Sequence, residues 1–165
     1  MAHSSNMIPL SYVSPPDELD EVRKIFLEYQ QFLGVDLCFQ SFDEELKNLH
    51  KVYAQPQGCI ILAKTPENEV VGCVALKPIA EGVCEMKRLY VKSTHRGHHL
   101  GKNLVQELLH FARTANYHTM KLDTLTSLES AIAIYRKVGF VETTPYVFNP
   151  LNDVLYFELN LLSES

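Results

Sequence analysis

Residues 91–102, VKSTHRGHHLGK, form the segment whose residue types and spacing are best suited to binding an anion. The pattern predicts a strand that ends where the segment begins, then a polar turn with two glycines, then an amphipathic helix. Such a turn directs unpaired backbone N–H groups and the positive end of the helix dipole at one point, where a phosphate can bind. Arg96 and Lys102 add positive charge, and Gly101 permits close approach of the backbone. The segment predicts a phosphate site, and the alternative is a solvated basic loop.

The same turn contains His95, His98 and His99, a run that raises the question of a metal site. No cysteine or carboxylate within the turn completes a tetrahedral ligand set. We therefore interpret these histidines as solvated side chains beside an anion and expect no metal.

The elements that must position this turn follow from the periodicity of apolar residues. Helical spacing predicts a helix that opens at Ser14 and a shorter one that begins near Ser41, where Ser41 and Glu44 have capping-box spacing. The β-rich runs predict strands at 8–13, 59–63, 70–76, 83–91, 120–124, 145–148 and 153–160, and further helices are expected near 100–115 and 128–138. This order predicts an α+β fold with a mixed, mostly antiparallel central sheet and helices on both faces.

The composition is that of a folded globular protein. The chain has 165 residues, of which 46% are hydrophobic and 21% charged, so we expect a single domain over 7–162 with residues 1–6 as a flexible N-terminus. The net charge of −5 gives no global basic field, so neither nucleic acid nor an anionic membrane is an expected partner.

The cysteines and the apolar runs indicate in which cellular compartment the protein is expected. Four cysteines, at 38, 59, 73 and 84, form no C-x-x-C pair and three of them fall in predicted strands, which indicates reduced core residues. The longest apolar runs are short strands, and the first residues lack the apolar stretch of a signal peptide. We therefore expect a cytoplasmic protein.

Two motifs together carry a resemblance to a known family. RGHHLG at 96–101 resembles the (Gln/Arg)-x-x-Gly-x-(Gly/Ala) signature of the GNAT superfamily of N-acetyltransferases, and AIAIYRKVGF at 131–140 resembles that family's A-x-x-x-Y-x-x-x-G-F helix. The two motifs lie about 30 residues apart within a matching order of elements, and the resemblance covers nearly the whole chain. The resemblance implies a GNAT-like acyl-CoA N-acyltransferase fold and acetyl-CoA as cosubstrate.

The resemblance also implies which residues bind the cofactor. The turn would bind the pyrophosphate, and backbone groups near the end of the 83–91 strand would stabilise the oxyanion, while the parted sheet edge there would bind the pantetheine arm. The implied cofactor-binding residues are Leu89, Tyr90, Val91, Arg96, Gly97, His98, His99, Leu100, Gly101, Lys102 and Ser130.

Two positions depart from the family pattern. His99 stands where the signature has its middle glycine, so its backbone must adopt an ordinary conformation or hold a strained positive φ. Leu128 occupies the place where many relatives carry an asparagine, so a polar contact to the cofactor must be missing or be supplied by Ser127 or Ser130.

Transfer of acetyl to an amine needs a proton acceptor for the ammonium and a proton donor for the leaving thiolate. Glu85 is the candidate base, since the family often has a carboxylate on this strand, although it could equally pair across the sheet with a lysine. Tyr135 is the candidate general acid, since the resemblance places it beside the CoA sulfur; its alternative is a core tyrosine on an apolar stripe. A covalent intermediate on Cys84 is disfavoured because no histidine is adjacent in the sequence.

The acceptor site is expected between the loop that joins the first two helices and the C-terminal strand pair. Tyr29, Asp36 and Phe39 would suit an ammonium-bearing small molecule, and Arg88 could instead bind a carboxylate. Further candidates in these segments are Gln40, Tyr146, Phe148, Asn149 and Asn152.

The main hypothesis is direct acetyl transfer from acetyl-CoA to a primary amine of a small molecule. The alternatives are a protein or peptide N-acetyltransferase, and a non-catalytic acyl-CoA sensor, which the two departures at His99 and Leu128 keep open. A homodimer through the late strands is possible on symmetry grounds.

Overall fold

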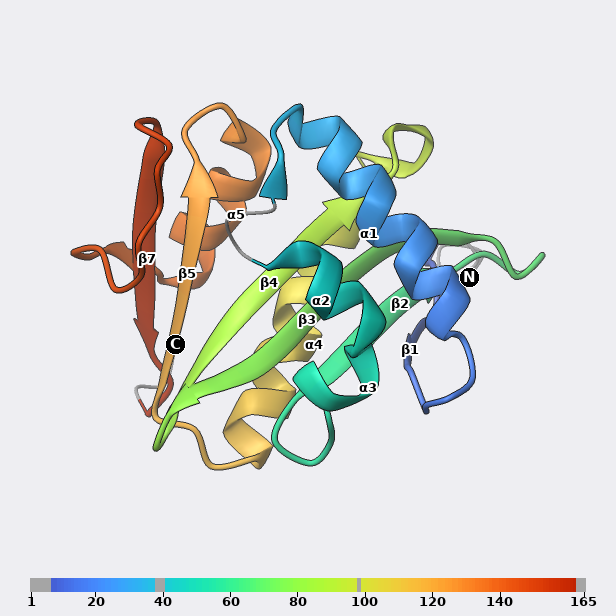
Figure 1. The fold of residues 1–165 in the computed structure, drawn as a ribbon, viewed down its shortest axis with the longest axis horizontal. Coiled ribbons are helices and arrows are strands. Elements are labelled where there is room, and N and C mark those ends of the chain that lie inside the picture. The colour runs from blue at the N-terminus through green and yellow to red at the C-terminus, as the bar shows by residue number, and fades with distance from the viewer. Residues whose placement is uncertain (1–6, 38–40, 98, 163–165) are drawn as a thin grey trace.

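The computed structural model describes residues 7–37, 41–97 and 99–162. Within them a seven-stranded sheet has the order β1-β2-β3-β4-β5-β7-β6 (Figure 1). All neighbouring strands pair antiparallel except β4 and β5, which run parallel. The strands are β1 (Leu10–Tyr12), β2 (Cys59–Lys64), β3 (Val70–Ala80), β4 (Val83–Val91), β5 (Thr119–Leu125), β6 (Val141–Glu142) and β7 (Val154–Asn160). The mixed, mostly antiparallel sheet that the sequence predicts is confirmed.

Helices cover both faces of the sheet (Figure 1). One face carries α1 (Leu19–Leu33), α2 (Phe42–Lys47) and α3 (Leu49–Val52), and the other carries α4 (Leu100–Thr114) and α5 (Glu129–Val138). Each face has its own apolar core, because alternate residues of a strand point to opposite sides. On β2, Ile60 and Leu62 pack with the first core, whereas Ile61 packs with the second, among residues of α4, β5 and β7.

Strands β4 and β5 splay apart and leave a gap in the sheet. Their pairing is confined to residues 83–85 against 119–121, although β4 continues to Val91 and β5 to Leu125. Beyond these residues the two strands diverge (Figure 1). Beyond the paired residues, the backbone groups on the facing edges of β4 and β5 therefore do not hydrogen-bond to each other.

Most predicted elements are found close to their predicted bounds, and two predictions at the ends of the chain are wrong. The first helix begins at Leu19 rather than Ser14, because residues 14–17 form a turn in which the N–H of Asp17 donates to the carbonyl of Ser14. Residues 145–148 are not a strand; the short β6 at 141–142 pairs with β7 in its place. The predicted helix start at Ser41 is correct, although no side-chain capping hydrogen bond forms there.

Within the described residues, none of the helices has the length and apolar character needed to cross a membrane.

Candidate active site

The turn after β4 has the conformation that an anion site requires. A short 3-10 helix, η3 (Ser93–His95), leads into the turn, and α4 begins at Leu100. His99 has φ 60° and Gly97 has φ 87°, so His99 holds the left-handed conformation in which the family signature places glycine. The first turn of α4 contains no acidic residue, so its free N–H groups and dipole are available to an anion.

A cavity of about 520 Å³ opens beside this turn, between the end of β4 and the helices α4 and α5. Its described lining carries the positive side chains Arg96, Lys102 and Lys137 and one carboxylate, Glu129. A diphosphate is favoured by this excess of positive charge together with the helix N-terminus. The residues present therefore fit the phosphorylated part of a coenzyme A molecule.

The structure brings together the residues predicted to bind the cofactor. His98 lies outside the described residues. The other ten line this cavity: Leu89, Tyr90, Val91, Arg96, Gly97, His99, Leu100, Gly101, Lys102 and Ser130. Ser127, Leu128 and Ser130 also line it, so two hydroxyls flank the position of the asparagine found in many relatives. At Gly101 a Cβ would lie 3.0 Å from the side chain of Ile134, so α4 and α5 approach closely there.

One wall of the large cavity comes from α1, far away in the sequence. The guanidinium of Arg96 stacks on the ring of Phe32, 4.6 Å from its centroid, and its Nε donates to the carbonyl of Val91 at 2.9 Å. Nearby, the hydroxyl of Tyr90 donates to Glu28 at 2.8 Å. These contacts hold α1 against the anion-binding turn.

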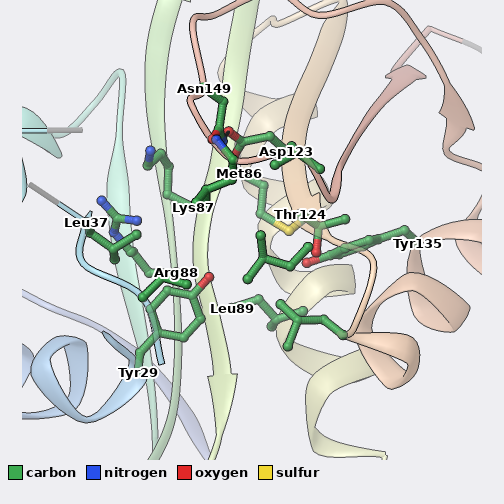
Figure 2. Close-up of a pocket in the computed structure, with 15 residues that line it drawn as sticks. Tyr29, Leu37, Met86, Lys87, Arg88, Leu89, Asp123, Thr124, Tyr135 and Asn149 are labelled. Atoms are coloured by element: carbon green, nitrogen blue, oxygen red, sulfur yellow. Dashed lines mark hydrogen bonds between the residues drawn. The ribbon is translucent and has the colours of Figure 1, made fainter. Parts of the chain in front are cut away.

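A second, smaller cavity of about 50 Å³ lies in the gap between the splayed strands (Figure 2). Its polar lining comes from α1, β4, β5, α5 and the segment before β7, and comprises Tyr29, Lys87, Arg88, Asp123, Thr124, Tyr135 and Asn149. Tyr29, Leu89 and Leu128 line both cavities, so the cavities meet at these three residues.

Tyr135 lies at this small cavity with its side chain 6% exposed. Figure 2 shows Tyr29 and Tyr135 entering from opposite sides. Burial raises the pKa of Tyr135 well above the ordinary phenol value and raises the pKa of Tyr29 to about 12. Both hydroxyls are therefore protonated at neutral pH and can donate a hydrogen bond.

The two candidate carboxylates of the site differ in position. Glu85 is 4% exposed and lines neither cavity; it accepts a hydrogen bond from Tyr146 at 2.7 Å and lies 4.0 Å from the ammonium of Lys77. Asp123 on β5 lines the small cavity and accepts a long hydrogen bond, 3.4 Å, from the side-chain amide of Asn149. Asp123 is not among the site residues predicted from the sequence, because it occupies an ordinary half-buried position of an alternating strand, which gives no local signal.

The predicted acceptor residues are only partly brought together. Tyr29, Arg88 and Asn149 line the small cavity, whereas Asp36 does not, although its neighbours Val35 and Leu37 do. Tyr146, Phe148 and Asn152 do not line it, and Phe148 is 83% exposed. Phe39 and Gln40 lie outside the described residues.

Arg88 sits in a β-bulge of β4. Tyr90 pairs with Cys73 and Lys87 with Ala75, so three steps along β4 oppose two along β3, and Arg88 has φ 64°. Its guanidinium binds both carboxylate oxygens of Glu45, at 3.1 and 2.6 Å. Burial alone would raise the pKa of Glu45, but the hydrogen bonds and charge of Arg88 lower it below the usual value. An acceptor carboxylate would have to compete with this pair for Arg88.

The cysteines in the described part of the chain, Cys59, Cys73 and Cys84, are free and buried. Burial raises the pKa of the Cys84 thiol to about 12, so this side chain is a thiol rather than a thiolate at neutral pH. Within the described part of the chain, no three His, Cys, Asp or Glu side chains lie close enough together to hold a metal ion.

Comparisons with known proteins place this geometry in a family. The model of the acetyltransferase (GNAT) family matches residues 19–140. An uncharacterized N-acetyltransferase of Schizosaccharomyces pombe is 40% identical over 155 residues, which cover 93% of this chain and 95% of the relative. An IAA acetyltransferase of Azospirillum brasilense is 32% identical over 128 residues, which cover 77% of this chain and 81% of the relative. The structure of the acetyltransferase yncA of Salmonella typhimurium with its cofactor acetyl-CoA superimposes with a TM-score of 0.71 at 16% identity, covering 96% of each chain.

Proposed function

The chain belongs to the GNAT acetyltransferase family and is an N-acetyltransferase, and from this premise we propose that it transfers the acetyl group of acetyl-CoA directly to a primary amine of a small molecule. The observation that carries the proposal is the meeting of the two cavities at Tyr29, Leu89 and Leu128. Acetyl-CoA bound on one side of the sheet can present its thioester at this junction, where an acceptor arrives from the other side. Acetyl transfer then needs no covalent enzyme intermediate.

In this proposal the large cavity binds acetyl-CoA. The N–H groups at the start of α4, with Arg96 and Lys102, bind the pyrophosphate. The exposed edge of β4 around Leu89–Val91 (89–91) pairs with the pantetheine amides, since β5 diverges from it there. The same backbone segment stabilises the oxyanion of the tetrahedral intermediate.

Two side chains of the small cavity would move the protons. The acceptor ammonium must lose a proton before its nitrogen attacks the thioester carbon, and the thiolate must gain one when the C–S bond breaks. Tyr135 is the proposed proton donor to the thiolate, because its hydroxyl is buried, protonated and beside the junction. For the base, position favours Asp123 over Glu85, because Asp123 lines the cavity and Glu85 lines neither.

A small acceptor is favoured by the walls of this cavity. Helix α1, the segment around Leu37 and the segment around Asn149 surround it on several sides. A side chain on a folded protein or a long peptide would need an open groove past these segments. We propose that the acceptor ammonium binds between the carboxylate of Asp123 and the ring of Tyr29.

The test is a two-stage assay. Thermal unfolding is measured with and without acetyl-CoA, and thiol release is then followed over a panel of small amines and of peptides. We expect acetyl-CoA to raise the melting temperature and small amines to support turnover. Turnover on peptides alone would contradict the small-molecule acceptor, and binding without turnover on any amine would favour the sensor.

A further inference from the structure

The bulge of β4 is the backbone feature closest to the proposed reaction. Arg88 holds a left-handed φ of 64° in the middle of a strand, a conformation that a long side chain rarely adopts unless its surroundings impose it. Its sequence neighbours face the site: Lys87 lines the small cavity and Leu89 lines both cavities. The direction of the peptide groups at the junction therefore depends on the conformation of Arg88.

Helix α2 supplies the contacts that hold Arg88 in place. The guanidinium is 3% exposed, is gripped at two points by Glu45, and lies over the ring of Phe42 with 5.1 Å to its centroid. Glu45 also accepts a hydrogen bond of 2.7 Å from the hydroxyl of Tyr53. On the backbone side, the thiol of Cys73 donates to the carbonyl of Arg88 at 3.2 Å. The bulge is thus fastened through both its side chain and its main chain.

Stability alone is a poor explanation for this arrangement. A buried ion pair seldom stabilises a fold more than apolar side chains of the same volume would, because desolvating the charges offsets their attraction. A two-point guanidinium–carboxylate contact does, however, fix the orientation of the guanidinium plane. Because the guanidinium belongs to Arg88, the contact also restricts the conformation of Arg88 in β4.

We propose that Glu45 is a positioning residue for catalysis: through Arg88 it holds the β4 bulge in the conformation that directs backbone N–H groups around Leu89 at the thioester carbonyl. The inference rests on the proposed function, because it requires acetyl-CoA at the junction of the cavities. Glu45 contacts neither substrate, and its effect reaches the reaction only through the direction of these peptide groups.

The experiment reads the thioester carbonyl itself, so it needs no acceptor. Acetyl-CoA labelled with ¹³C at the carbonyl is bound to the full-length protein, and the C=O stretch is recorded by isotope-edited infrared spectroscopy. Bound to the wild type, the stretch should move to lower wavenumber than in free acetyl-CoA, because N–H donors polarise the carbonyl. In Glu45→Gln, and in Arg88→Lys, which keeps the charge but not the two-point contact, most of this shift should be lost.

Kinetics and a matched control complete the test. With an amine found in the screen, Glu45→Gln should lower kcat about 10- to 100-fold and leave KM for acetyl-CoA within about twofold, as expected for weakening an interaction that strengthens in the transition state. Asp20→Asn removes the exposed ion pair with Arg23 on α1 and should change neither readout. If Glu45→Gln does not fold, Tyr53→Phe, which retains the ion pair but removes one donor to Glu45, should give a smaller loss in the same direction.

Two results would overturn the inference. One is that Glu45→Gln and Arg88→Lys keep the same carbonyl shift as the wild type and differ from it only in a lower melting temperature. The ion pair would then be purely structural. The other is an unshifted carbonyl in the wild type despite bound acetyl-CoA, while amine turnover proceeds; that result would leave the proposed function standing. Failure of acetyl-CoA to bind at all would instead overturn the proposed function and the inference with it.

Discussion

The two cavities that meet at the splayed strands are built in different ways. The large cavity is formed mainly by one continuous stretch, 89–102, together with α5, and the groups proposed to bind the diphosphate there are the N–H groups at the start of α4 with Arg96 and Lys102. The small cavity is assembled from side chains of α1, β4, β5, α5 and the segment before β7. A ligand common to many enzymes can be bound by backbone geometry, whereas a ligand specific to one enzyme must be recognised by side chains.

This difference predicts that substitutions will separate into two groups. Substitutions that obstruct the large cavity should alter acetyl-CoA binding and leave the acceptor site intact. Changes at Asp123 or Tyr135 should do the reverse. A variant that changes the binding of the other substrate instead would contradict this assignment of the two cavities.

The largest effect is expected from Gly101→Phe. The new side chain would project into the large cavity beside Ile134, which already lies 3.0 Å from the position of a Cβ. The stabilisation by acetyl-CoA, about 2.7 kcal/mol at one hundred times Kd in the wild type, should disappear. Thermal unfolding with and without acetyl-CoA measures this, and circular dichroism checks that the variant is folded. Gly34→Ala, at a positive-φ glycine with no atom within 4 Å of a Cβ, is the control and should retain the full shift.

Asp123→Asn should lower kcat/KM for the amine by about 100-fold or more, because it removes the proposed proton acceptor without changing the shape of the pocket. The melting shift caused by acetyl-CoA should stay unchanged. Glu85→Gln is the matched control, since Glu85 lines neither cavity. A large loss in Glu85→Gln with a small one in Asp123→Asn would return the role of base to Glu85, as the sequence alone predicted.

Tyr135→Phe should lower kcat about 10- to 100-fold, since the thiolate then has to take its proton from water. The ring packs 5.8 Å from that of Phe140, a contact that phenylalanine preserves, so stability should change little. Steady-state kinetics with acetyl-CoA as the varied substrate separates kcat from KM. Unchanged kcat would make Tyr135 a core residue only.

The smallest effect is expected from His99→Gly. His99 already holds φ 60°, so relief of its strain should appear as stability, about 1 kcal/mol in the free energy of unfolding, rather than as affinity for acetyl-CoA. Denaturant unfolding measures the gain and titration with acetyl-CoA measures the affinity. Asn68→Gly, at φ 72° in a surface turn, should gain less, because asparagine tolerates this conformation. A tenfold change in affinity in His99→Gly would contradict this reasoning.

The difference between the cavities also explains what the sequence could predict. The turn at 91–102 is local, so its glycines and charges indicate its structure directly, and the strands at 59–64, 83–91 and 119–125 follow from their periodicity. The start of α1 was missed because Pro15 and Pro16, which suit a first helical turn, are also turn residues.

The small cavity could not be predicted in the same way, because its residues meet only in three dimensions. In the sequence, Asp123 and Glu85 are both carboxylates on predicted strands. The structure distinguishes them, because Glu85 lies where β4 and β5 are paired and Asp123 lies beyond that pairing. Likewise, nothing local in the sequence indicates that Glu45, on a six-residue helix, pairs with Arg88, 43 residues away.

The most direct test of the meeting point of the two cavities is a crystal structure of the protein grown with coenzyme A. We expect the diphosphate at the N-terminus of α4 and the sulfur at the junction formed by Tyr29, Leu89 and Leu128, within hydrogen-bonding reach of the Tyr135 hydroxyl. Coenzyme A bound elsewhere, or bound at α4 with its sulfur directed away from the small cavity, would contradict the proposed site.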